Sequence, residues 1–344
     1  MSATNNQFTN IRVFISEIPE GVAPNKSYFR TVTVTEDKPV LEDGAIFVKN
    51  AVFSLDPYIV YDFSKGNKES SVAGFGIGKI IDSKNPTFPV GSTFFGPIRW
   101  ESYSVLNKEQ ELSQSVNLDA GLDKELPLSV YNGVLGLSGF TVWDSLRRLG
   151  NLKKGETIYI SSAAGTLGQL AGQLAKRQGL RVIGSAGSDE KVTFLKKELG
   201  FDAAFNYKTQ DKREALIAAA PNGIDIYYDL VFDNTVEVAL DLLNTHGRII
   251  TVGALAMHQN QGIAVPRNLI NILMKQIRYE GYVVYEYYDQ WEAFWTEVTP
   301  LVRKGEIKFD ETLIEGGLDI VAETYDRFLQ GGYKGKVSVK IADL

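Results

Sequence analysis

The stretch YISSAAGTLGQLAGQLAKRQG, from Tyr159 to Gly179, decides the fold. It runs from an apolar strand pattern through a tight turn of small residues into a helical pattern. In the dinucleotide fingerprint G-x-G-x-x-G, the first glycine serves the turn, the second admits the pyrophosphate and the third lets the helix pack closely. Ala163, Gly165 and Gly168 stand at these positions, so the two strictest glycines are kept. Taken alone, the turn fits a dinucleotide site and an ordinary strand-turn-helix equally well.

Helical and strand patterns alternate on the C-terminal side of this turn. Helical patterns cover 166–179, 188–200, 212–220 and 236–247, and strand patterns cover 181–186, 203–207, 224–231 and 248–255. This alternation predicts βαβ units on a parallel sheet. Residues 11–110 instead hold short β-rich runs broken by turn residues, which predict a β-rich domain. Alternation of apolar residues in GKVSVKI, 335–341, predicts a final strand that rejoins this domain.

The bulk composition excludes several classes of protein. The length of 344 residues predicts two domains. A net charge of −6 with scattered Lys and Arg excludes the basic footprint of a nucleic-acid binder. The N-terminus is polar, and no apolar run approaches the roughly 18 residues of a membrane span, so we expect a cytoplasmic protein with no membrane partner. With no cysteine and only His246 and His258, no disulfide, thiolate nucleophile or metal site is expected.

The end of the predicted strand 181–186 helps to distinguish NADH from NADPH as the cofactor. An NAD enzyme places Asp or Glu about 20 residues after the turn, where it binds the ribose hydroxyls. Ser185 and Gly187 leave no carboxylate there. Ser188 suits the N-cap of the next helix, and Lys191 falls in the first helical turn, where the helix dipole disfavours a cation. A 2′-phosphate explains this lysine, which predicts NADPH rather than NADH, although Lys191 alone also fits a solvated surface lysine.

Several long segments carry a family resemblance. They are SLDPY (54–58), SKNPTFPVGSTFFGPIRWESYSV (83–105), GVLGLSGFTVW (133–143), SAAGTLGQLAGQLAK (162–176), GSAGSDEKVTFLKKELGFDAAFNYK (184–208) and NTHGRII (244–250). With them, the chain resembles the zinc-independent medium-chain reductases, in the branch of 2-alkenal (enone) double-bond reductases that includes prostaglandin reductase. The resemblance implies an α/β fold in which a Rossmann-type doubly wound parallel sheet, residues 131–307, is inserted into a β-rich, GroES-like catalytic domain. That domain comprises residues 1–130 plus 308–344, and a homodimer is implied by the resemblance alone.

The resemblance also implies a set of positions that bind NADPH. They are, in chain order, Thr141, Gly165, Thr166, Leu167, Gly168, Lys191, Tyr207, Gly253, Ala254, Leu255, Tyr282, Val283, Val284 and Tyr333. Within this set, Gly165 to Gly168 match the pyrophosphate turn, and Lys191 and Tyr207 match the pair that holds the 2′-phosphate. Thr141 matches the threonine near the nicotinamide amide.

Three positions depart from the pattern of the branch. The branch usually has DNVGG where this chain has DLVFD, so a cofactor-contacting asparagine becomes Leu230. A second such asparagine, near the C-terminus, is replaced by Tyr333. The tyrosine of the GAIS-x-Y-N loop aligns with His258 in GALAMHQ, so His258 either takes over the polar role beside the substrate carbonyl or the role is absent here.

The expected activity is NADPH-dependent reduction of the carbon-carbon double bond of an enal or enone, a small apolar carbonyl substrate. Hydride delivered to the β carbon requires a hydrogen-bond donor at the developing enolate. The catalytic candidates in the chain are His258 and Tyr58, and the ribose hydroxyl of the cofactor is a third candidate donor. A quinone or carbonyl reductase on the same scaffold is the nearest alternative. A non-catalytic NADPH-binding sensor is an alternative of another class. The aromatic run GYVVYEYYDQW, with Trp100 and Tyr103, fits either an apolar substrate cleft or core packing, and His246 fits a turn-capping role.

Overall fold

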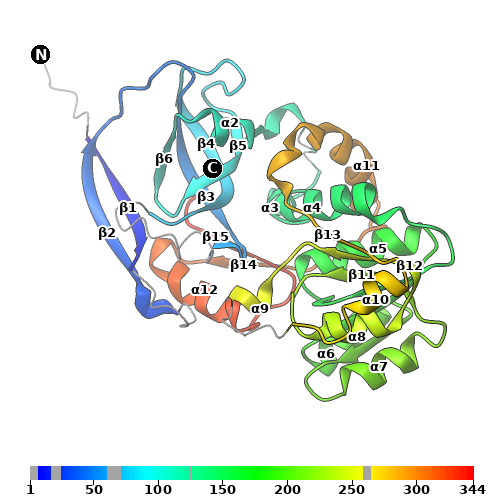
Figure 1. Cartoon of the computed structure of the whole chain (residues 1–344). Helices are drawn as coiled ribbons and strands as arrows, with labels where there is room; N and C mark the ends of the chain where they lie inside the picture. The colour runs from blue at the N-terminus through cyan, green and yellow to red at the C-terminus, as the bar shows by residue number, and fades with distance from the viewer. Residues whose placement is uncertain (1–6, 17–24, 60–70, 122, 124, 259–264) are drawn as a thin grey trace, which may run out of the picture. The chain divides into compact units, whose positions relative to one another are not determined.

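The computed structural model describes residues 7–16, 25–59, 71–121, 123, 125–258 and 265–344, without the side chains of Met257 and His258 (Figure 1). The chain divides into two compact units. The central unit comprises residues 133–310, and the terminal unit comprises residues 1–132 and 311–344. No helix in the described part of the chain has the length and apolar character needed to cross a membrane.

The central unit is built on a six-stranded parallel sheet with the strand order β10-β9-β8-β11-β12-β13. Its strands are β8 (Thr157–Ile160), β9 (Arg181–Ala186), β10 (Ala203–Asn206), β11 (Ile224–Asp229), β12 (Leu243–Thr251) and β13 (Arg278–Gly281). The chain runs outward from β8 to β10 and then returns to β11, so the strand order reverses between β8 and β11. Dinucleotides bind at such a switch point, beyond the carboxyl ends of the strands.

Helices connect these strands on both faces of the sheet. They are α4 (Leu137–Ser145), α5 (Thr166–Arg177), α6 (Asp189–Lys197), α7 (Lys212–Ala219), α8 (Thr235–Leu242), α9 (Leu255–His258), α10 (Ile270–Met274) and α11 (Trp291–Arg303), with short helical turns at Leu146–Gly150, Val284–Glu286 and Tyr288–Gln290. On one face, α7 and α8 pack with Ile183 of β9 in an apolar cluster. On the other face, Gly184 of β9 and Gly172 of α5 leave room for the Phe201 ring. The alternation of strand residues between two helical layers explains the near-continuous apolar strands.

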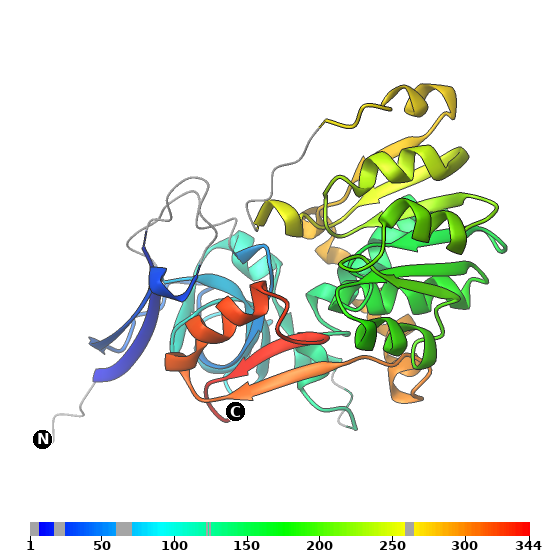
Figure 2. The same cartoon turned by 90° about the horizontal axis from the view of Figure 1, so that it is seen from below.

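The terminal unit is mostly β-structure. A hairpin of β1 (Gln7–Ile15) and β2 (Phe29–Asp37) accompanies a seven-stranded sheet in the order β14-β15-β3-β4-β5-β7, with β6 paired to β3. Its strands are β3 (Ile46–Leu55), β4 (Ala73–Ser83), β5 (Thr93–Arg99), β6 (Tyr103–Leu106), β7 (Val116–Asn117), β14 (Glu311–Glu315) and β15 (Lys336–Lys340). Its helices are α2 (Glu109–Ser113), α3 (Ser129–Asn132) and α12 (Val321–Leu329), with short turns at Lys26–Tyr28, Leu118–Ala120 and Leu318–Ile320. Figure 2 shows how strongly this sheet curves around its core.

The structure confirms the predicted fold class, a doubly wound parallel sheet combined with a β-rich domain. The final strand β15 pairs antiparallel with β3, so the tail rejoins the β-rich unit. Two predicted elements were wrong in their extent. The helical pattern over 236–247 ends at Leu242, and the strand predicted over 248–255 is β12, which begins at Leu243 and ends at Thr251. The Lys275 ammonium stops the helix by donating to three carbonyl oxygens, those of Leu240, Asp241 and Leu243, at 3.1, 2.7 and 2.9 Å.

Candidate active site

The glycine-rich turn joins β8 to α5 at the switch point. The Ala163 N–H donates to the Ser185 carbonyl of β9 at 2.9 Å, and the Gly165 N–H donates to the Ser162 carbonyl at 2.9 Å. A Cβ atom added to Gly168 would lie 2.6 Å from Ala163 Cα and 2.7 Å from the carbonyl oxygens of Ala163 and Ser162. Because these neighbours are backbone atoms, only glycine allows α5 to pack so closely against the turn.

The alanine at the first fingerprint position has a matching gap opposite it. Ala163 is fully buried, and a Cβ atom on Gly184 of β9 would lie 2.7 Å from its methyl carbon. The methyl group therefore occupies space that a glycine on the neighbouring strand leaves free. Replacement of the fingerprint glycine by alanine is thus compatible with the tight turn.

The N-terminus of α5 is open to a ligand. Its N-cap residue is Gly165, which has no side chain to accept a hydrogen bond from the first helical turn. In the same unit, α6 is capped by Ser188 and α7 by Asp211, while α4, α8 and α11 also lack a side-chain cap. What distinguishes α5 is that its uncapped start follows the glycine turn at the switch point. The first N–H groups of a helix have no partners within the helix and favour an anion. This turn fits the pyrophosphate of a dinucleotide.

A buried carboxylate organises the loop across the switch point. Asp229 ends β11 without solvent exposure, and its Oδ1 accepts from Ser161 Oγ at 3.2 Å and from the Tyr227 hydroxyl at 2.9 Å. The same oxygen accepts the N–H groups of Val231 and Phe232, each at 3.0 Å. Burial raises the pKa of Asp229, while these hydrogen bonds oppose the shift. Sequence reasoning missed this residue, although a carboxylate at the end of an apolar strand was a usable signal.

Two loops meet beside this carboxylate. A Cβ atom on Gly253 would lie 2.6 Å from the Leu230 carbonyl oxygen, so the loop after β12 packs directly on the loop after β11. The Gly253 N–H donates to the Asp229 carbonyl at 3.2 Å, and the Ala256 N–H donates to the Val231 carbonyl at 2.9 Å. Gly253, Ala254 and Leu255 therefore lie at the carboxyl edge of the sheet, as a cofactor loop requires, and Leu230 is buried.

The predicted 2′-phosphate residues lie in the segments that follow β9 and β10. Ser188 is the N-cap of α6, as the sequence predicts, and it places Lys191 in the first helical turn. Tyr207 follows β10, and its N–H donates to the Ala186 carbonyl at 3.1 Å. The Tyr207 hydroxyl lies 3.0 Å from the point where a Cβ atom on Gly187 would be. The hydroxyl thus lies over a strand end that carries no carboxylate.

The segment after β13 is anchored by a side chain. Tyr282 is buried, and its hydroxyl donates to Asp144 Oδ2 of α4 at 2.7 Å, which also accepts from Arg148 Nε at 2.6 Å. Burial, followed by the hydrogen bond to Asp144, raises the pKa of Tyr282. Tyr282 therefore fixes the backbone from which Val283, which is exposed, projects. Val284 is buried, and Thr141 donates its hydroxyl to the Leu137 carbonyl of its own helix at 2.8 Å.

Two predicted residues belong to the terminal unit. Tyr58 lies in a turn closed by the Ile59 N–H on the Asp56 carbonyl at 3.2 Å. Asp56 Oδ1 pairs with Lys336 Nζ at 2.5 Å, and the Asp56 carboxylate also accepts from Ser54 Oγ. Both Tyr58 and Tyr333 pack against the apolar core of this unit. His258 ends α9, and its side chain lies outside the described residues.

Trp100 and Trp291, two of the aromatic residues that fit either a cleft or a core, belong to the core. Trp100 is fully buried and packs against Phe29 and Tyr325. Trp291 is also buried and stacks on Phe140 of α4, with ring centroids 4.5 Å apart. The packing interpretation is confirmed for these two rings. His246 adopts a φ of 64° at a bend in β12, and its N–H donates to the Lys275 carbonyl at 2.7 Å, so it serves the bend.

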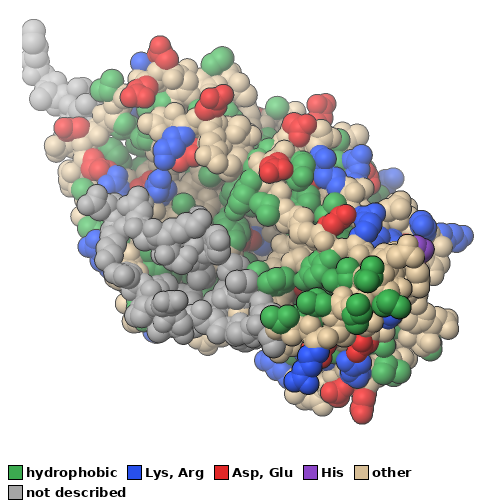
Figure 3. Space-filling model, in the orientation of Figure 1, with side chains coloured by type: hydrophobic (Ala, Val, Ile, Leu, Met, Phe, Trp, Pro, Cys, Tyr) green, Lys and Arg blue, Asp and Glu red, His purple; other side chains and the backbone are tan. Residues whose placement is uncertain are grey.

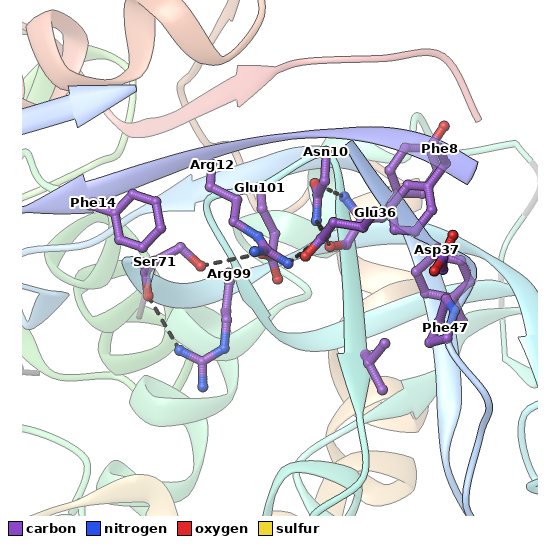
Figure 4. A pocket seen from close by; sticks show the side chains of 13 residues that line it. Phe8, Asn10, Arg12, Phe14, Glu36, Asp37, Phe47, Ser71, Arg99 and Glu101 are labelled. Atoms are coloured by element: carbon purple, nitrogen blue, oxygen red, sulfur yellow. Dashed lines mark hydrogen bonds and ion pairs between the residues drawn. The ribbon is translucent and has the colours of Figure 1, made fainter. Parts of the chain in front are cut away.

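A cavity of about 380 Å³ lies between the β1–β2 hairpin and the sheet of the terminal unit (Figure 4). None of the predicted cofactor-binding or catalytic residues lines it, although Tyr103, a candidate for a substrate cleft, does. The charges at its centre pair with one another. Arg12 donates to Glu36 at 2.7 Å and to Glu101 at 2.9 Å. Burial raises the pKa of Glu101, against hydrogen bonds from Ser104 and Arg12. This network ties the hairpin to the sheet.

Comparisons with known proteins extend along most of the chain. A family model described as "Zinc-binding dehydrogenase" matches residues 166–299, and one described as "N-terminal domain of oxidoreductase" matches residues 12–114. (+)-Pulegone reductase of Mentha piperita is 36% identical over 317 residues, which cover 89% of this chain and 90% of that protein. The NADP(+)-dependent 2-alkenal reductase of Nicotiana tabacum is 34% identical over 323 residues, covering 90% and 91%. The crystal structure of CurA from Vibrio vulnificus in complex with NADPH is 27% identical with a TM-score of 0.84, covering 97% and 100%.

The open turn at the switch point and these relatives define an NADPH-dependent oxidoreductase. The chain belongs to the medium-chain dehydrogenase/reductase family, in the branch that contains the 2-alkenal reductases. One matching family model is described as that of a zinc-binding dehydrogenase, and this sequence contains no cysteine.

Proposed function

We propose that this protein uses NADPH to reduce the carbon-carbon double bond of α,β-unsaturated aldehydes or ketones. The observation that carries the proposal is the open N-terminus of α5, together with a strand end that offers Lys191 and Tyr207 instead of a carboxylate. The names of the relatives support the reaction, since pulegone reductase and 2-alkenal reductase are each similar along about nine-tenths of the chain.

The residues of the central unit would hold the cofactor. The N–H groups of the turn from Gly165 to Gly168 suit the pyrophosphate, and Lys191 with Tyr207 suits the 2′-phosphate. The backbones at Gly253–Leu255 and Tyr282–Val284, with Thr141, would border the nicotinamide half. In this proposal, residues 131–307 form the nucleotide domain, and residues 1–130 plus 308–344 form the catalytic domain, to which Tyr333 belongs.

When bound, NADPH supplies the hydride. The task of the protein is to bind the substrate carbonyl, to orient it and to exclude water. Charge develops on the carbonyl oxygen as the β carbon is reduced, so a hydrogen-bond donor at that oxygen lowers the barrier. The Tyr58 hydroxyl and the His258 imidazole are the proposed donors. Because imidazole titrates near neutral pH, His258 is also the proposed source of the proton for the α carbon.

Product analysis separates this function from its alternatives. The purified protein is incubated with NADPH and, in separate reactions, with an enal, a quinone and a saturated aldehyde, and the products are identified. A saturated aldehyde from the enal supports the proposal. Turnover of only the quinone or only the saturated aldehyde would assign the protein to quinone or carbonyl reduction. Tight NADPH binding without turnover of any acceptor would instead make it a sensor, an option that the departures at Leu230, His258 and Tyr333 keep open.

We also propose that the protein forms a homodimer through the outer edge of β13. Among the described strands, β13 is the last of its sheet. The Tyr282 N–H donates to the Thr251 carbonyl of β12, so the N–H and C=O groups of Tyr279 point to the free edge. Antiparallel pairing of two copies centred on Tyr279 places Arg278 of each chain opposite Glu280 of the other. Pairing centred on either charged residue would place like charges opposite each other.

An exposed apolar patch lies on the helix that precedes β13 in the chain. It is formed by four side chains of α10 and the position before it, which are 42% to 71% exposed: Leu269, Ile270, Leu273 and Met274. Figure 3 shows apolar side chains gathered over α10. Such a patch is typical of a subunit interface. Light scattering coupled to size exclusion should give twice the monomer mass for the wild type and the monomer mass for a Leu273→Asp/Met274→Lys variant. A monomeric wild type would refute the proposed dimer.

A further inference from the structure

Lys208 has no role in the cofactor site assigned above, yet its side chain lies over the end of β9. Its Cε lies 3.3 Å from the point where a Cβ atom on Gly187 would be, and the Tyr207 hydroxyl lies 3.0 Å from the same point. Two consecutive side chains thus converge on one glycine. A side chain at position 187 would occupy the space between them, so glycine keeps this surface open.

The backbone that carries Lys208 is tied to the helix that carries Lys191. Asn206 is buried, and its Oδ1 accepts from the Lys208 N–H at 3.1 Å. Its Nδ2 donates to Asp189 Oδ1, the first residue of α6, at 2.8 Å. This amide fixes the turn after β10 relative to the start of α6 and also occupies one oxygen of the nearby Asp189 carboxylate.

A comparison with Lys212 shows why Lys208 is the lysine that can take a ligand. Lys212 Nζ lies 5.9 Å from the centre of the Tyr207 ring, but it is paired with Asp233 at 2.6 Å and donates to Thr235 Oγ1 at 2.9 Å. In the part of the chain that the structure describes, Lys208 Nζ makes no ion pair or hydrogen bond. It is exposed, so it can turn toward a phosphate without breaking a contact.

We infer that Lys208 is a specificity-determining residue for NADPH, acting as a second cation beside Lys191 and Tyr207 at the 2′-phosphate. A phosphate monoester carries roughly −1.5 to −2 charges at pH 7, so one lysine neutralises it only in part. Two lysines and a phenol hydroxyl supply charge-assisted hydrogen bonds to three phosphate oxygens. The inference rests on the proposed placement of the adenosine end of NADPH near Gly187.

Binding measurements on the whole protein test this role without relying on turnover. Calorimetry with NADPH, NADH, 2′,5′-ADP and 5′-AMP compares the wild type with Lys208→Ala. We expect the substitution to weaken NADPH and 2′,5′-ADP about tenfold, while NADH and 5′-AMP change less than about twofold. Lys208→Arg keeps the charge and should restore most of the NADPH affinity. Lys196→Ala is the matched control, since it removes an exposed lysine from the last turn of α6 and should leave all four ligands unchanged.

The outcomes also separate this inference from the proposed function. If Lys208→Ala binds NADPH like the wild type, or loses NADH equally, the role of Lys208 is refuted. If the role of Lys208 is refuted but Lys191→Ala lowers the preference for NADPH over NADH, the proposed phosphate site stands without Lys208. If neither variant changes the preference, the 2′-phosphate binds elsewhere and both assignments fail. Failure to reduce an enal would contradict only the proposed reaction, because the binding data do not depend on it.

Discussion

The Ala163 methyl carbon, in the turn after β8, faces Gly184 of β9, and a Cβ atom on Gly184 would lie 2.7 Å from that methyl carbon. Both residues are small because they share one space, and the Phe201 ring closes it from the side, 2.9 Å from the same point. The missing first glycine of the fingerprint is therefore balanced by a glycine on the adjacent strand.

The double substitution Ala163→Gly/Gly184→Ala tests this exchange. Gly184→Ala alone should lower the free energy of unfolding by about 1–3 kcal/mol, because the added methyl overpacks the space. Adding Ala163→Gly should recover part of the loss, although the contact with Phe201 persists. Chemical denaturation of the single and double variants gives the coupling. Independent, additive effects would show that the two residues do not share a space.

Gly168→Ala should disrupt the turn itself. Its added methyl would meet backbone atoms of Ala163 and Ser162, which cannot rotate away. We expect NADPH affinity to fall by about tenfold or more, with a measurable loss of thermal stability. Gly281→Ala is the stability control, since a Cβ atom there has no neighbour within 4 Å. Equal thermal stability of the two variants would contradict the close packing of α5.

Lys191→Ala should weaken NADPH much more than NADH. The lysine would face a charged phosphate in one cofactor and a neutral hydroxyl in the other, so the NADPH affinity should fall by about tenfold or more. Fluorescence titration with both cofactors measures the ratio. Equal losses for NADPH and NADH would count against the phosphate assignment. Lys197→Ala, which removes an exposed lysine at the end of α6, serves as the charge control.

The buried ion pair between Asp56 and Lys336 should be sensitive to removal of one partner. Lys336→Met leaves the Asp56 carboxylate without its cation and should cost about 3–5 kcal/mol of stability. The double variant Asp56→Asn/Lys336→Met removes both charges and should regain much of this loss. Lys340→Met, on the same strand, breaks only exposed ion pairs and should cost far less. Similar losses at both lysines in urea unfolding would contradict the assignment.

The ion pair between Glu156 and Arg248 makes stability depend on pH in acid. Arg248 donates to both Glu156 oxygens, at 2.9 and 2.6 Å. Burial tends to raise the pKa of Glu156, but hydrogen bonds from Arg248 and the Lys153 N–H outweigh it and hold the pKa below 4.5. A carboxyl with a lower pKa in the folded state stabilises the fold above its unfolded pKa, and that stability is lost as the pH falls through the folded value.

Glu156→Gln should therefore be less stable than the wild type at pH 7, and the difference should shrink below about pH 4.5. Thermal unfolding of both proteins across this range measures the effect. A difference that stays constant from pH 7 to pH 3 would show that Glu156 does not keep a lowered pKa in the folded protein.

The parts of the fold that sequence predicts are those set by local chemistry. Ser188 caps α6 because its hydroxyl reaches the N–H three residues on, and the period of apolar residues marks β8 and α5. The end of α8 depends on Lys275, which lies more than thirty residues away along the chain. The local pattern therefore predicted a helix that extends beyond Leu242. The long-range partners of Asp56 and Trp100 were invisible for the same reason.

The candidate site also combines features set by neighbours in sequence with features set by neighbours only in space. The close packing of Gly168 against Ala163 and Ser162 joins residues within a few positions of one another, whereas the fit of Ala163 against Gly184 joins residues that are neighbours only in space. The role of Ser161 at Asp229 depends on two strands that are neighbours only in space, so it could not be read from either segment. The assignments of Tyr58 and His258 to catalysis stay predictions, because they concern a bound substrate.

The uncapped start of α5 also links cofactor supply to the lifetime of the protein. A ligand that binds only the folded state stabilises it by about 2.7 kcal/mol at a concentration one hundred times its dissociation constant. Since Gly165 leaves the first N–H groups of the helix without a side-chain acceptor, NADPH bound in the proposed position would supply acceptors for them. A cell depleted of NADPH would thus expose more of this protein to proteases than a cell rich in it.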